Sequence, residues 1–422
     1  MTTGLLSNGG VSKMVIPPET RVHKTATSLR ELQSELNDLF PERENLITQL
    51  IYALLTKEHV LIFGKFGTGK SKLMEYFFGS FTGANMFSIE MTKFMTESNI
   101  VGIPNPKIMR EEGRIWHERA GTMLDAHFAE LDEIFDATDY LLRGTLLGIL
   151  NERRFNRGVQ LEKANLHMAV ASTNADPQGE IKRSPALGAV VDRFLFQTRV
   201  FYLEKDSSRR RMYAKYLSGD QPSVQIPYED IAEFADSVAL VPITDPILLE
   251  LHNRIIQDFR KKKEVEFSDR RACQALRLVQ ANALLFGRDE VLPDDFMAVM
   301  WALSYGHSQN TQDEFKGVAT PLIDKAAGEM KPDVIRTQMK LLEEFERRLT
   351  SALEISRDAG TGISTPENLV SARRALVQLD TDVKEIKPSH VTIEDRQKSI
   401  LASLASARGK VDDLIDGKAA TS

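Results

Sequence analysis

One stretch of this sequence decides its fold, namely His59-Val60-Leu61-Ile62-Phe63-Gly64-Lys65-Phe66-Gly67-Thr68-Gly69-Lys70-Ser71. Its first five residues are mostly apolar and strand-like, and residues 72–78 behind it are helix-like. The segment between them matches the pattern G-x-x-x-x-G-K-[ST] at every fixed position. The order strand, glycine loop, helix is the context in which that pattern binds phosphate. The stretch therefore predicts an α/β protein with a phosphate-binding loop.

Each part of this loop has a chemical reason. Glycines let the backbone curl so that several N–H groups converge on phosphate oxygens, and the helix N-terminus adds a partial positive charge there. Lys70 can reach the β- and γ-phosphates, and the Ser71 hydroxyl can bind Mg²⁺. The predicted nucleotide-binding residues are Gly64, Lys65, Phe66, Gly67, Thr68, Gly69, Lys70 and Ser71.

The whole-chain composition narrows the class of protein. The chain has 422 residues, 27% of them charged, and a formal net charge of -6, which disfavours nucleic acid or an acidic membrane as a partner. Cys273 is the only cysteine, so an intrachain disulfide is impossible. The N-terminal residues do not resemble a secretory signal, and we find no apolar stretch of membrane-spanning length. We therefore expect a cytoplasmic protein without membrane insertion.

The pattern along the chain predicts four regions. Residues 1–27 read as a flexible leader, and 28–205 as an α/β nucleotide-binding domain whose apolar runs predict a five-stranded parallel sheet. Residues 206–307 read as an all-helical lid domain, and 308–422 as a C-terminal helical accessory region. The strand candidates are 59–63, 86–90, 126–131, 166–172 and 194–201. The breaks expected in the last region are Pro321, Pro332, residues 360–362 and Pro388.

A second strand ends in adjacent carboxylates, Asp132 and Glu133. Successive residues of a strand point to opposite faces, so Asp132 can face Mg²⁺ while Glu133 aims at an attacking water. Glu130 is an unusual residue inside that strand, and paired acids also occur in solvated turns. The glycine loop upstream favours the catalytic interpretation.

Three further positions carry polar groups that suit nucleotide hydrolysis. Asn174 follows the strand candidate 166–172, where its amide could orient water, although Asn also favours turns. Arg193 precedes the last strand, and Arg270 and Arg271 begin a helix in the lid region. Arginine suits transition-state phosphate charge because it is planar, cationic and bidentate, although a lone Arg is often a surface cation.

Taken in order, these motifs resemble the MoxR family of AAA+ ATPases, and within it the RavA-like branch. The resemblance covers roughly residues 28–305. The segments that carry it are Pro41-Glu42-Arg43-Glu44, the glycine loop, Glu97-Ser98-Asn99-Ile100-Val101-Gly102, Gly113-Arg114-Ile115-Trp116 onward to Leu124, Leu131-Asp132-Glu133-Ile134-Phe135, Ala171-Ser172-Thr173-Asn174, Val191-Asp192-Arg193-Phe194 and Ser268-Asp269-Arg270-Arg271. Phe66 stands where relatives carry Pro, and residues 308–422 lie outside the resemblance.

The resemblance implies a role for each candidate. Asn174 is similar to the sensor 1 residue, and Arg193 to the finger that reaches a neighbouring subunit's nucleotide. Arg270 matches the sensor 2 position on a lid over the γ-phosphate, with Arg271 as a close alternative nucleotide contact. Residues 93–118 resemble the helix-2 insert, and 152–158 the hairpin before sensor 1. Ile134 and Phe135 narrow the likeness to the RavA-like branch.

The family likeness implies a Mg²⁺-dependent ATPase that forms a ring, expected to be a hexamer. It also implies chaperone-like remodelling or maturation of a protein client, such as a von Willebrand A-domain protein. Two alternatives remain at this point. One is a nucleotide-gated scaffold with slow turnover, and the other is a McrB-like nucleic-acid motor, which the acidic net charge disfavours.

Overall fold

The computed structural model describes residues 20–157, 160–183, 185–243, 245–263, 267–303, 309–330, 332–360, 366–386, 388 and 391–415. Most of the predicted leader and the glycine pair expected at 360–362 therefore lie, wholly or in part, outside the described residues. The chain divides into two compact units. Unit 1 comprises residues 1–244, 252–291 and 297–319, and unit 2 comprises 245–251, 292–296 and 320–422.

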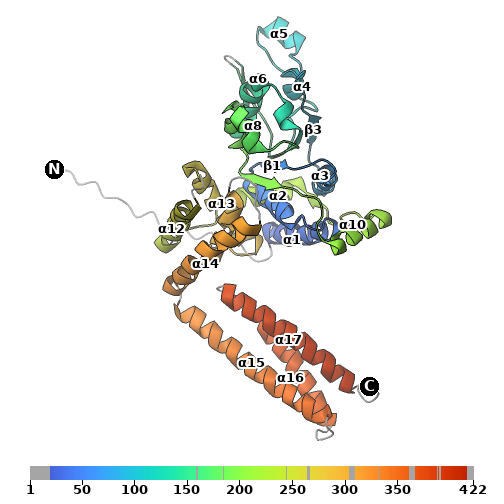
Figure 1. The fold of residues 1–422 in the computed structure, drawn as a ribbon, viewed down its shortest axis with the longest axis vertical. Coiled ribbons are helices and arrows are strands. Elements are labelled where there is room, and N and C mark those ends of the chain that lie inside the picture. The colour runs from blue at the N-terminus through green and yellow to red at the C-terminus, as the bar shows by residue number, and fades with distance from the viewer. Residues whose placement is uncertain are drawn as a thin grey trace, which may run out of the picture. The chain divides into compact units, whose positions relative to one another are not determined.

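Unit 1 is built on a five-stranded sheet in which every neighbouring pair is parallel. Its strands are β1 (Val60–Phe63), β3 (Met86–Glu90), β4 (Phe128–Asp132), β7 (Met168–Thr173) and β8 (Phe196–Arg199). They lie in the order β3-β4-β7-β1-β8, which places β1 between β7 and β8. All four residues of β1 are buried, as expected for a central parallel strand with helices on both faces. The predicted fold class is confirmed (Figure 1).

Two N-terminal helices precede the sheet, and the first begins earlier than the sequence pattern predicts. They are α1 (Arg21–Leu39) and α2 (Glu44–Thr56). The expected leader extended to residue 27, whereas Val22, Thr25 and Ala26 are buried in the first turns of α1. Small Thr and Ala side chains continue the buried stripe that Leu29 begins, and this weak apolar signal explains the difference.

Helices cover the sheet between its strands. In chain order these elements are α3 (Lys70–Gly79), α4 (Ser98–Val101), α5 (Pro106–Glu112), η1 (Ile134–Asp136), α6 (Asp139–Leu141), η2 (Leu142–Leu146), α7 (Leu147–Glu152), α8 (Pro177–Arg183) and α9 (Pro185–Val191). One buried apolar cluster joins β1, β4 and β7 to the helices around them, and it includes Leu61, Leu131 and Phe194. This core fixes the ends of the strands, where the candidate residues lie.

The segments that resemble the helix-2 insert and the hairpin before sensor 1 contact each other. Pro104 pairs with His117 across α5, and β5 (Arg154–Arg157) pairs with β6 (Gln160–Lys163) in an antiparallel hairpin. His117 Nδ1 lies 2.6 Å from Glu162 Oε1, and the two side chains are 2% and 3% exposed. The insert and the hairpin therefore meet at a buried polar contact.

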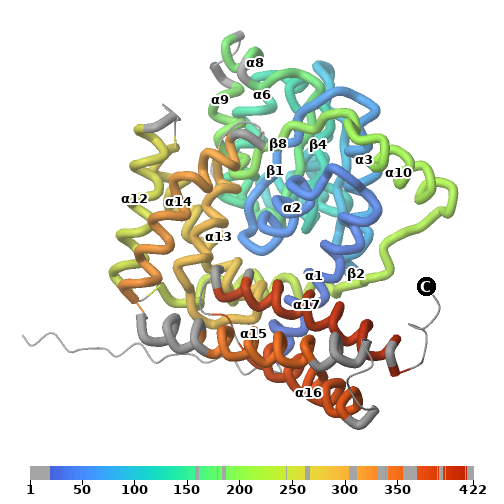
Figure 2. Tube along the Cα trace, turned by 60° about the horizontal axis from the view of Figure 1, so that its bottom comes forward, coloured from blue at the N-terminus to red at the C-terminus, as the bar shows by residue number. Residues whose placement is uncertain are grey.

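The lid region is helical apart from one short strand. It contains α10 (Asp206–Ser218), α11 (Tyr228–Val238), α12 (Pro246–Lys263), α13 (Asp269–Leu285) and the 3-10 segment η3 (Pro293–Ala302). The strand β9 (Ile226–Pro227) pairs with β2 (Phe81–Thr82), a contact that the helical pattern did not predict. Helix α13 packs against α1, α2 and α11, and Figure 2 shows it beside α2.

Unit 2 contains a three-helix bundle, in a region for which the sequence predicts helices without fixing how they pack. Helices α15 (Pro332–Gly360), α16 (Pro366–Glu385) and α17 (Val391–Ile415) pack against one another around a core that includes Leu342, Leu376 and Leu404. Helix α14 (Gln309–Met330) precedes the bundle. The break expected at Pro321 is wrong, because α14 continues through this residue. Among the described helices, none is long and apolar enough to cross a bilayer.

Candidate functional site

The glycine loop lies at the carboxyl end of β1, and its geometry depends on glycine at two positions. Gly64 has φ +150°, and a Cβ built there would lie 2.2 Å from the Val200 carbonyl oxygen. Gly69 has φ +83° and occupies the N-cap position of α3. A side chain at either position would clash or adopt a strained backbone conformation. Phe66, where the sequence departs from the family pattern, has a side chain that is 75% exposed.

Lys70 folds back over the loop. Its Nζ donates to the Gly64 carbonyl at 2.7 Å and to the Asn174 side-chain oxygen at 3.3 Å. Burial lowers the pKa of the Lys70 ammonium, and the nearby Glu133 and Asp132 carboxylates oppose that shift. The cation therefore sits among phosphate-binding backbone groups with two carboxylates close by.

The two carboxylates and the amide meet at the same edge of the sheet. Asp132 ends β4, and one of its oxygens accepts hydrogen bonds from the Ser172 hydroxyl and, at 3.1 Å, from the Glu133 backbone N–H. Glu133 has φ +49°, a left-handed conformation that non-glycine residues rarely adopt. Its carboxylate accepts hydrogen bonds from the Asn174 backbone N–H at 3.1 Å and from the Asn174 side-chain amide.

Parallel strand order explains why these groups converge. Strands β4, β7 and β1 are neighbours and run in the same direction, so their carboxyl ends share one edge of the sheet. Lys70, Glu133 and Asn174 consequently form a continuous set of contacts, although they come from three distant parts of the sequence. The backbone strain at Glu133 is of the kind that persists where surrounding structure imposes it, and such positions cluster at active sites.

The donors at this edge suit Mg²⁺ held together with a nucleotide. Ser71 is the second residue of α3, directly after Lys70, and Asp132 lies across the edge with its second oxygen uncommitted in the contacts found for it. Among the described residues, no group of three or more acidic, His or Cys side chains forms a metal cage. Mg²⁺ in nucleotide sites commonly uses one or two protein ligands, with phosphates and water completing the shell.

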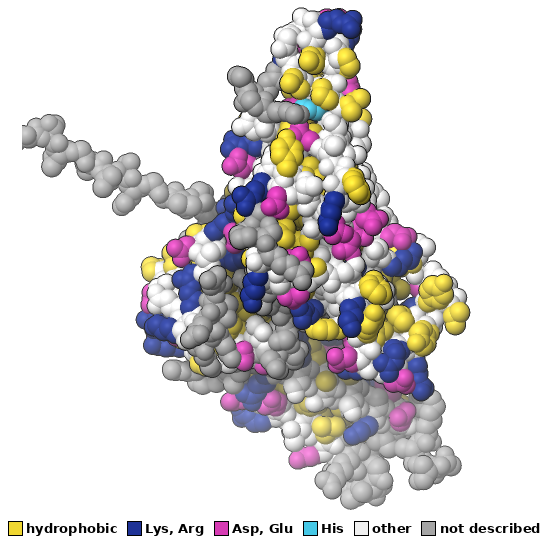
Figure 3. Space-filling view, turned by 45° about the horizontal axis from the view of Figure 1, so that its top comes forward, with side chains coloured by type: hydrophobic (Ala, Val, Ile, Leu, Met, Phe, Trp, Pro, Cys, Tyr) yellow, Lys and Arg dark blue, Asp and Glu magenta, His cyan; other side chains and the backbone are white. Residues whose placement is uncertain are grey.

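A cavity of about 470 Å³ opens beside the glycine loop. Its lining is rich in aromatic side chains from α1, α3, α10 and the segment after β8, namely Phe40, Tyr76, Tyr202, Tyr213 and Tyr216. Several of them are solvent-exposed, and Figure 3 shows hydrophobic side chains gathered over α10, at the right of the view. Apolar cavities of this size with polar groups at one side are typical of small-ligand sites.

Sequence reasoning missed this cavity and the residue that braces it. Arg43 Nη2 donates to the Thr68 carbonyl of the loop at 3.2 Å and to the Phe201 carbonyl at 2.7 Å. No local pattern in segment 41–44 indicates a contact with the loop, because the fold brings the two segments together. The spacing of Met212, Tyr213 and Tyr216 on α10 was an available signal, because these residues share one helix face.

The arginine candidates lie at the opposite edge of the sheet. Val60, the first residue of β1, pairs with Phe196, whereas Phe63 pairs with Arg199. Arg193 precedes β8 and therefore lies at the amino edge, separated from the glycine loop by the length of β1, about 10 Å at the usual rise per residue. Arg270 shares this edge with Arg193 because both lie within 4 Å of Asp192.

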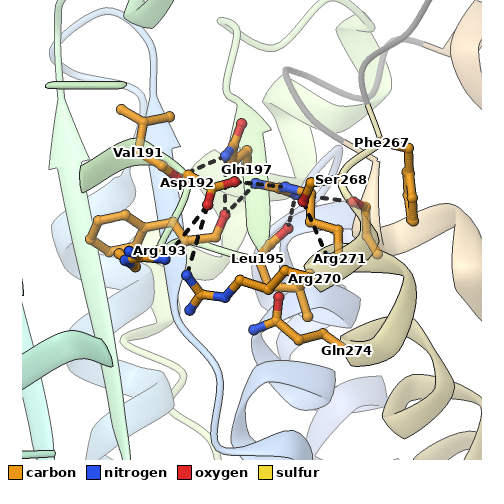
Figure 4. A network of polar contacts seen from close by, with 12 residues as sticks. Val191, Asp192, Arg193, Leu195, Gln197, Phe267, Ser268, Arg270, Arg271 and Gln274 are labelled. Carbon is orange, nitrogen blue, oxygen red and sulfur yellow. Dashed lines mark hydrogen bonds and ion pairs between the residues drawn. The ribbon is translucent and has the colours of Figure 1, made fainter. Parts of the chain in front are cut away.

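One carboxylate, Asp192, faces three guanidinium groups (Figure 4). Its Oδ2 lies 3.7 Å from Arg193 Nη1 and 3.8 Å from Arg270 Nη1, and its Oδ1 lies 3.6 Å from Arg271 Nε. Arg270 Nη2 also donates to the Asn151 side-chain oxygen at 2.9 Å. The Nε of Arg193 and the Nη1 of Arg270 are buried atoms without a hydrogen-bond partner.

Arg271 differs from its neighbour in burial and in partners. Its side chain is 3% exposed, and its guanidinium donates to the backbone carbonyls of Phe194, Leu195 and Ala302 at 2.9–3.0 Å. The structure therefore gives Arg271 a role in joining α13 to the segment before β8. Arg270 lies near the start of α13, at the amino edge, and the sensor 2 role that the family likeness implies for it stays a prediction.

The sheet order, the glycine loop and the acids at the strand tips together define an AAA+ ATPase fold with a helical lid and C-terminal helices. Two family models match this chain. The first describes the MoxR domain in MoxR-vWA-beta-propeller ternary systems and matches residues 27–234, and the second describes an AAA lid domain and matches 244–312. Residues 27–234 therefore match the MoxR family of AAA+ ATPases, and residues 244–312 match an AAA lid.

Several curated proteins are similar to this chain. It is 28% identical over 269 residues to the uncharacterized protein MJ0079 of Methanocaldococcus jannaschii, covering 63% of this chain and 67% of that protein. It is 23% identical to the chaperone MoxR1 of Mycobacterium tuberculosis, covering 63% and 71%. Among solved structures, a candidate ATPase from Cytophaga hutchinsonii has a TM-score of 0.51 at 18% identity, covering 72% and 95%.

Proposed function

We propose that this protein hydrolyses ATP in a Mg²⁺-dependent reaction and uses the energy to remodel or mature a protein partner. The observation that carries the proposal is the contact set at the carboxyl edge, in which Lys70 donates to Asn174 and Asn174 donates to Glu133 beside the glycine loop. A phosphate cradle, a cation, a carboxylate and an orienting amide are the parts that phosphoryl transfer to water requires.

Each residue has a distinct role in the proposal. The backbone N–H groups of residues 64–71 bind the phosphates, and Lys70 moves from the Gly64 carbonyl to the β- and γ-phosphates when ATP enters. Ser71 and Asp132 would hold Mg²⁺, which supplies neutralisation of phosphate charge. Glu133 orients the attacking water and accepts its proton, while Asn174 fixes the direction of that carboxylate.

The cavity beside the loop is the proposed base site. Tyr202 and the α10 aromatics lie next to Gly67 and Thr68, where a nucleotide with its phosphates in the loop would place its base. Planar aromatic side chains bind a purine ring by stacking and apolar contact. This assignment would explain why several aromatic side chains around the cavity are exposed to solvent in the single chain.

The active form in this proposal is a ring, with a hexamer as the expected size. Arg193 and Arg270 lie at the edge away from their own loop, so they can complete the nucleotide site of a neighbouring copy. A guanidinium placed there stabilises charge on the transferred phosphoryl group. Arg271 is proposed to stabilise the fold and not to contact nucleotide, because its guanidinium already donates to backbone carbonyls.

The partner is proposed to be a von Willebrand A-domain protein, and the activity chaperone-like. The matching family model describes MoxR domains in systems with such a partner, and one similar protein is named a chaperone. The RavA-like branch, the cytoplasmic location and the domain boundaries at 205 and 307 stay predictions. Residues 309–319 at the start of α14 belong to unit 1. We therefore propose that a separate accessory region begins after residue 319 and not at residue 308.

The direct test measures ATP turnover by the purified full-length protein with and without Mg²⁺. Lys70→Ala should abolish turnover, because the phosphates lose their cation, while Lys107→Ala, an exposed lysine of α5, should match wild type. Turnover that survives Lys70→Ala would contradict the site. Stable ATP binding with turnover below one per hour would favour a nucleotide-gated scaffold, and steep DNA stimulation would favour a nucleic-acid motor.

A further inference from the structure

Asn151 is the residue that directly holds Arg270, and it lies at the end of α7 just before the β5–β6 hairpin. Its side-chain oxygen accepts from Arg270 Nη2 at 2.9 Å, whereas Asp192 lies 3.8 Å from the other prong of the same guanidinium. Because arginine only donates, the amide of Asn151 must present its oxygen to this contact. The hydrogen bond therefore fixes the orientation of both side chains.

The segment that carries Asn151 is anchored independently of this contact. Arg153 has φ +52°, and its guanidinium donates to the carbonyls of Leu150 and Lys57 and contacts the His59 ring nitrogen at 2.7 Å. Burial lowers the pKa of Arg153 to about 10. Leu150 is itself 2% exposed. The backbone on both sides of Asn151 is thus held by buried groups.

The segment that carries Arg270 is anchored in its own way. Ser268 caps α13 by accepting from the Arg271 backbone N–H at 3.3 Å, and Arg271 donates to three backbone carbonyls. Both ends of the Asn151–Arg270 contact are consequently fixed without it. Ordering a long Arg side chain at a partly exposed position costs conformational entropy, so we expect the contact to contribute little to the free energy of folding. A role in function is therefore the better explanation for it.

We propose that Asn151 is a positioning residue that holds Arg270 in the orientation needed at a neighbouring copy's nucleotide. The inference rests on the proposed ATPase function and on the placement of Arg270 at the amino edge. One prong of the guanidinium is bonded to Asn151, the other is buried near Asp192 without a hydrogen-bond partner, and about a third of the Arg270 side chain is exposed. Preorganisation of this kind raises the rate without changing nucleotide affinity at the chain's own loop.

The position of Asn151 links the arginine to the β5–β6 hairpin. Asn151 and the hairpin strand β5 are separated only by Glu152 and Arg153, and the hairpin is tied to the helix-2 insert through the buried His117–Glu162 contact. The acceptor of Arg270 therefore lies at the foot of a hairpin that contacts the insert.

The test compares steady-state ATP turnover by full-length oligomers. Asn151→Ala should lower kcat about tenfold and leave KM for ATP within about twofold, because only an interaction in the transition state is lost. Asn151→Asp keeps the acceptor and should recover most of the rate. Asn151→Gln moves the acceptor by one methylene and should behave like Asn151→Ala. Glu152→Ala, at the same helix end, is the matched control and should equal wild type.

A double-mutant cycle separates positioning from a structural role. In an Arg270→Ala background, Asn151→Ala should cause no further loss of kcat, because its target is already absent. An equal loss in both backgrounds, or wild-type turnover in Asn151→Ala, would overturn the inference. If Arg270→Ala itself is fully active, Arg270 has no catalytic role and the inference fails while the ATPase proposal stands. If wild type shows no ATP turnover, the proposed function itself fails.

Discussion

The two edges of the parallel sheet present opposite kinds of chemistry. At the carboxyl edge, Lys70, Glu133 and Asn174 already contact one another within a single chain. At the amino edge, Arg193 and Arg270 share Asp192 at distances beyond an ordinary hydrogen bond, and each keeps a buried nitrogen without a hydrogen-bond partner. The first edge carries most of the groups that a nucleotide site needs. The second edge carries cations but lies away from the phosphate-binding loop.

The difference between the two edges indicates which steps of the proposed reaction a single chain can support. Groups at the carboxyl edge can bind and orient a nucleotide, because the glycine loop is part of the same edge. In the proposed mechanism, groups at the amino edge serve catalysis only when another copy brings its carboxyl edge to them. The contrast therefore makes predictions about which substitutions act within a subunit and which act across a subunit boundary.

Among the substitutions that test this contrast, removal of the Arg193 side chain should lower kcat the most. Arg193→Ala should lower kcat about 10³-fold, because charge on the transferred phosphoryl group loses its guanidinium. Arg210→Ala, on exposed α10, is the control. Mixed oligomers of Arg193→Ala and Lys70→Ala subunits should recover part of the activity. If mixed oligomers form and no ratio restores turnover, Arg193 does not act across the boundary.

Glu133→Gln tests the carboxyl edge alone. It should lower kcat by about 10² or more while ATP stays bound, because the carboxylate that activates water is lost and the phosphate contacts remain. Glu130→Gln is the matched control on the same strand, since Glu130 bonds Ser88 away from the loop. Nucleotide retained after gel filtration and single-turnover rates provide the measurement. A wild-type rate in Glu133→Gln would remove its assigned role.

The neighbouring pair Arg270 and Arg271 sharpens the contrast within one edge. Arg270→Ala should lower kcat about 10- to 100-fold and leave thermal stability unchanged. Arg271→Ala should cost about 3 kcal/mol of unfolding free energy, because three buried carbonyls lose their donor. Urea unfolding and steady-state turnover distinguish the two. The reverse pattern would show that the assignment is shifted by one residue.

The aromatic cavity should contribute to affinity more than to rate. Tyr213→Ala should raise KM for ATP about tenfold with kcat nearly unchanged, since a base contact is equal in the ground and transition states. Tyr140→Ala, an exposed tyrosine of α6, controls for loss of a surface ring. A fall in kcat without a change in KM would place the base elsewhere.

A separate expected effect, on stability and not on turnover, concerns protonation at the amino edge. Burial lowers the pKa of His167 to about 4, and its Nε2 lies 2.7 Å from the Leu54 carbonyl oxygen, which requires the neutral ring to donate there. The unfolded chain takes up this proton near pH 6.5, whereas the folded protein resists it. The stabilising contribution is therefore complete above pH 6.5 and is lost as pH falls toward 4, by about 3 kcal/mol at most.

His167→Gln should flatten this dependence. Unfolding free energies of both proteins from urea titrations between pH 7 and pH 4.5 would provide the comparison. Equal slopes in wild type and His167→Gln would mean that the ring is protonated in the folded protein as readily as in the unfolded chain.

Much of the sheet and of the carboxyl edge follows from sequence alone. A glycine loop behind an apolar strand, and acids at the tip of another strand, are local patterns, and parallel order brings strand tips together. The strand candidate 59–63 and the acids Asp132 and Glu133 therefore lie where the patterns predict. The left-handed backbone conformation of Glu133, by contrast, could not be predicted from the sequence, because Glu has no intrinsic preference for it.

The amino edge and the cavity are different, because they depend on pairs of residues far apart in the chain. Nothing in the sequence of Arg270 and Arg271 separates the exposed side chain from the buried one, since helix phase against β8 decides it. The continuation of α14 through Pro321 is another tertiary effect: one lost backbone hydrogen bond is tolerated within a 22-residue helix.

The early start of α1 has a consequence for how the protein is made. The buried face of α1 packs against α11 and α13, which lie about 190 and 230 residues further along the chain. At ordinary translation rates of 5–20 residues per second, that face waits roughly 10 to 40 s on the ribosome before its first distant partner emerges. Nascent chains of this protein should therefore expose an apolar helix for that interval, and a fast-translating host should shorten the exposure.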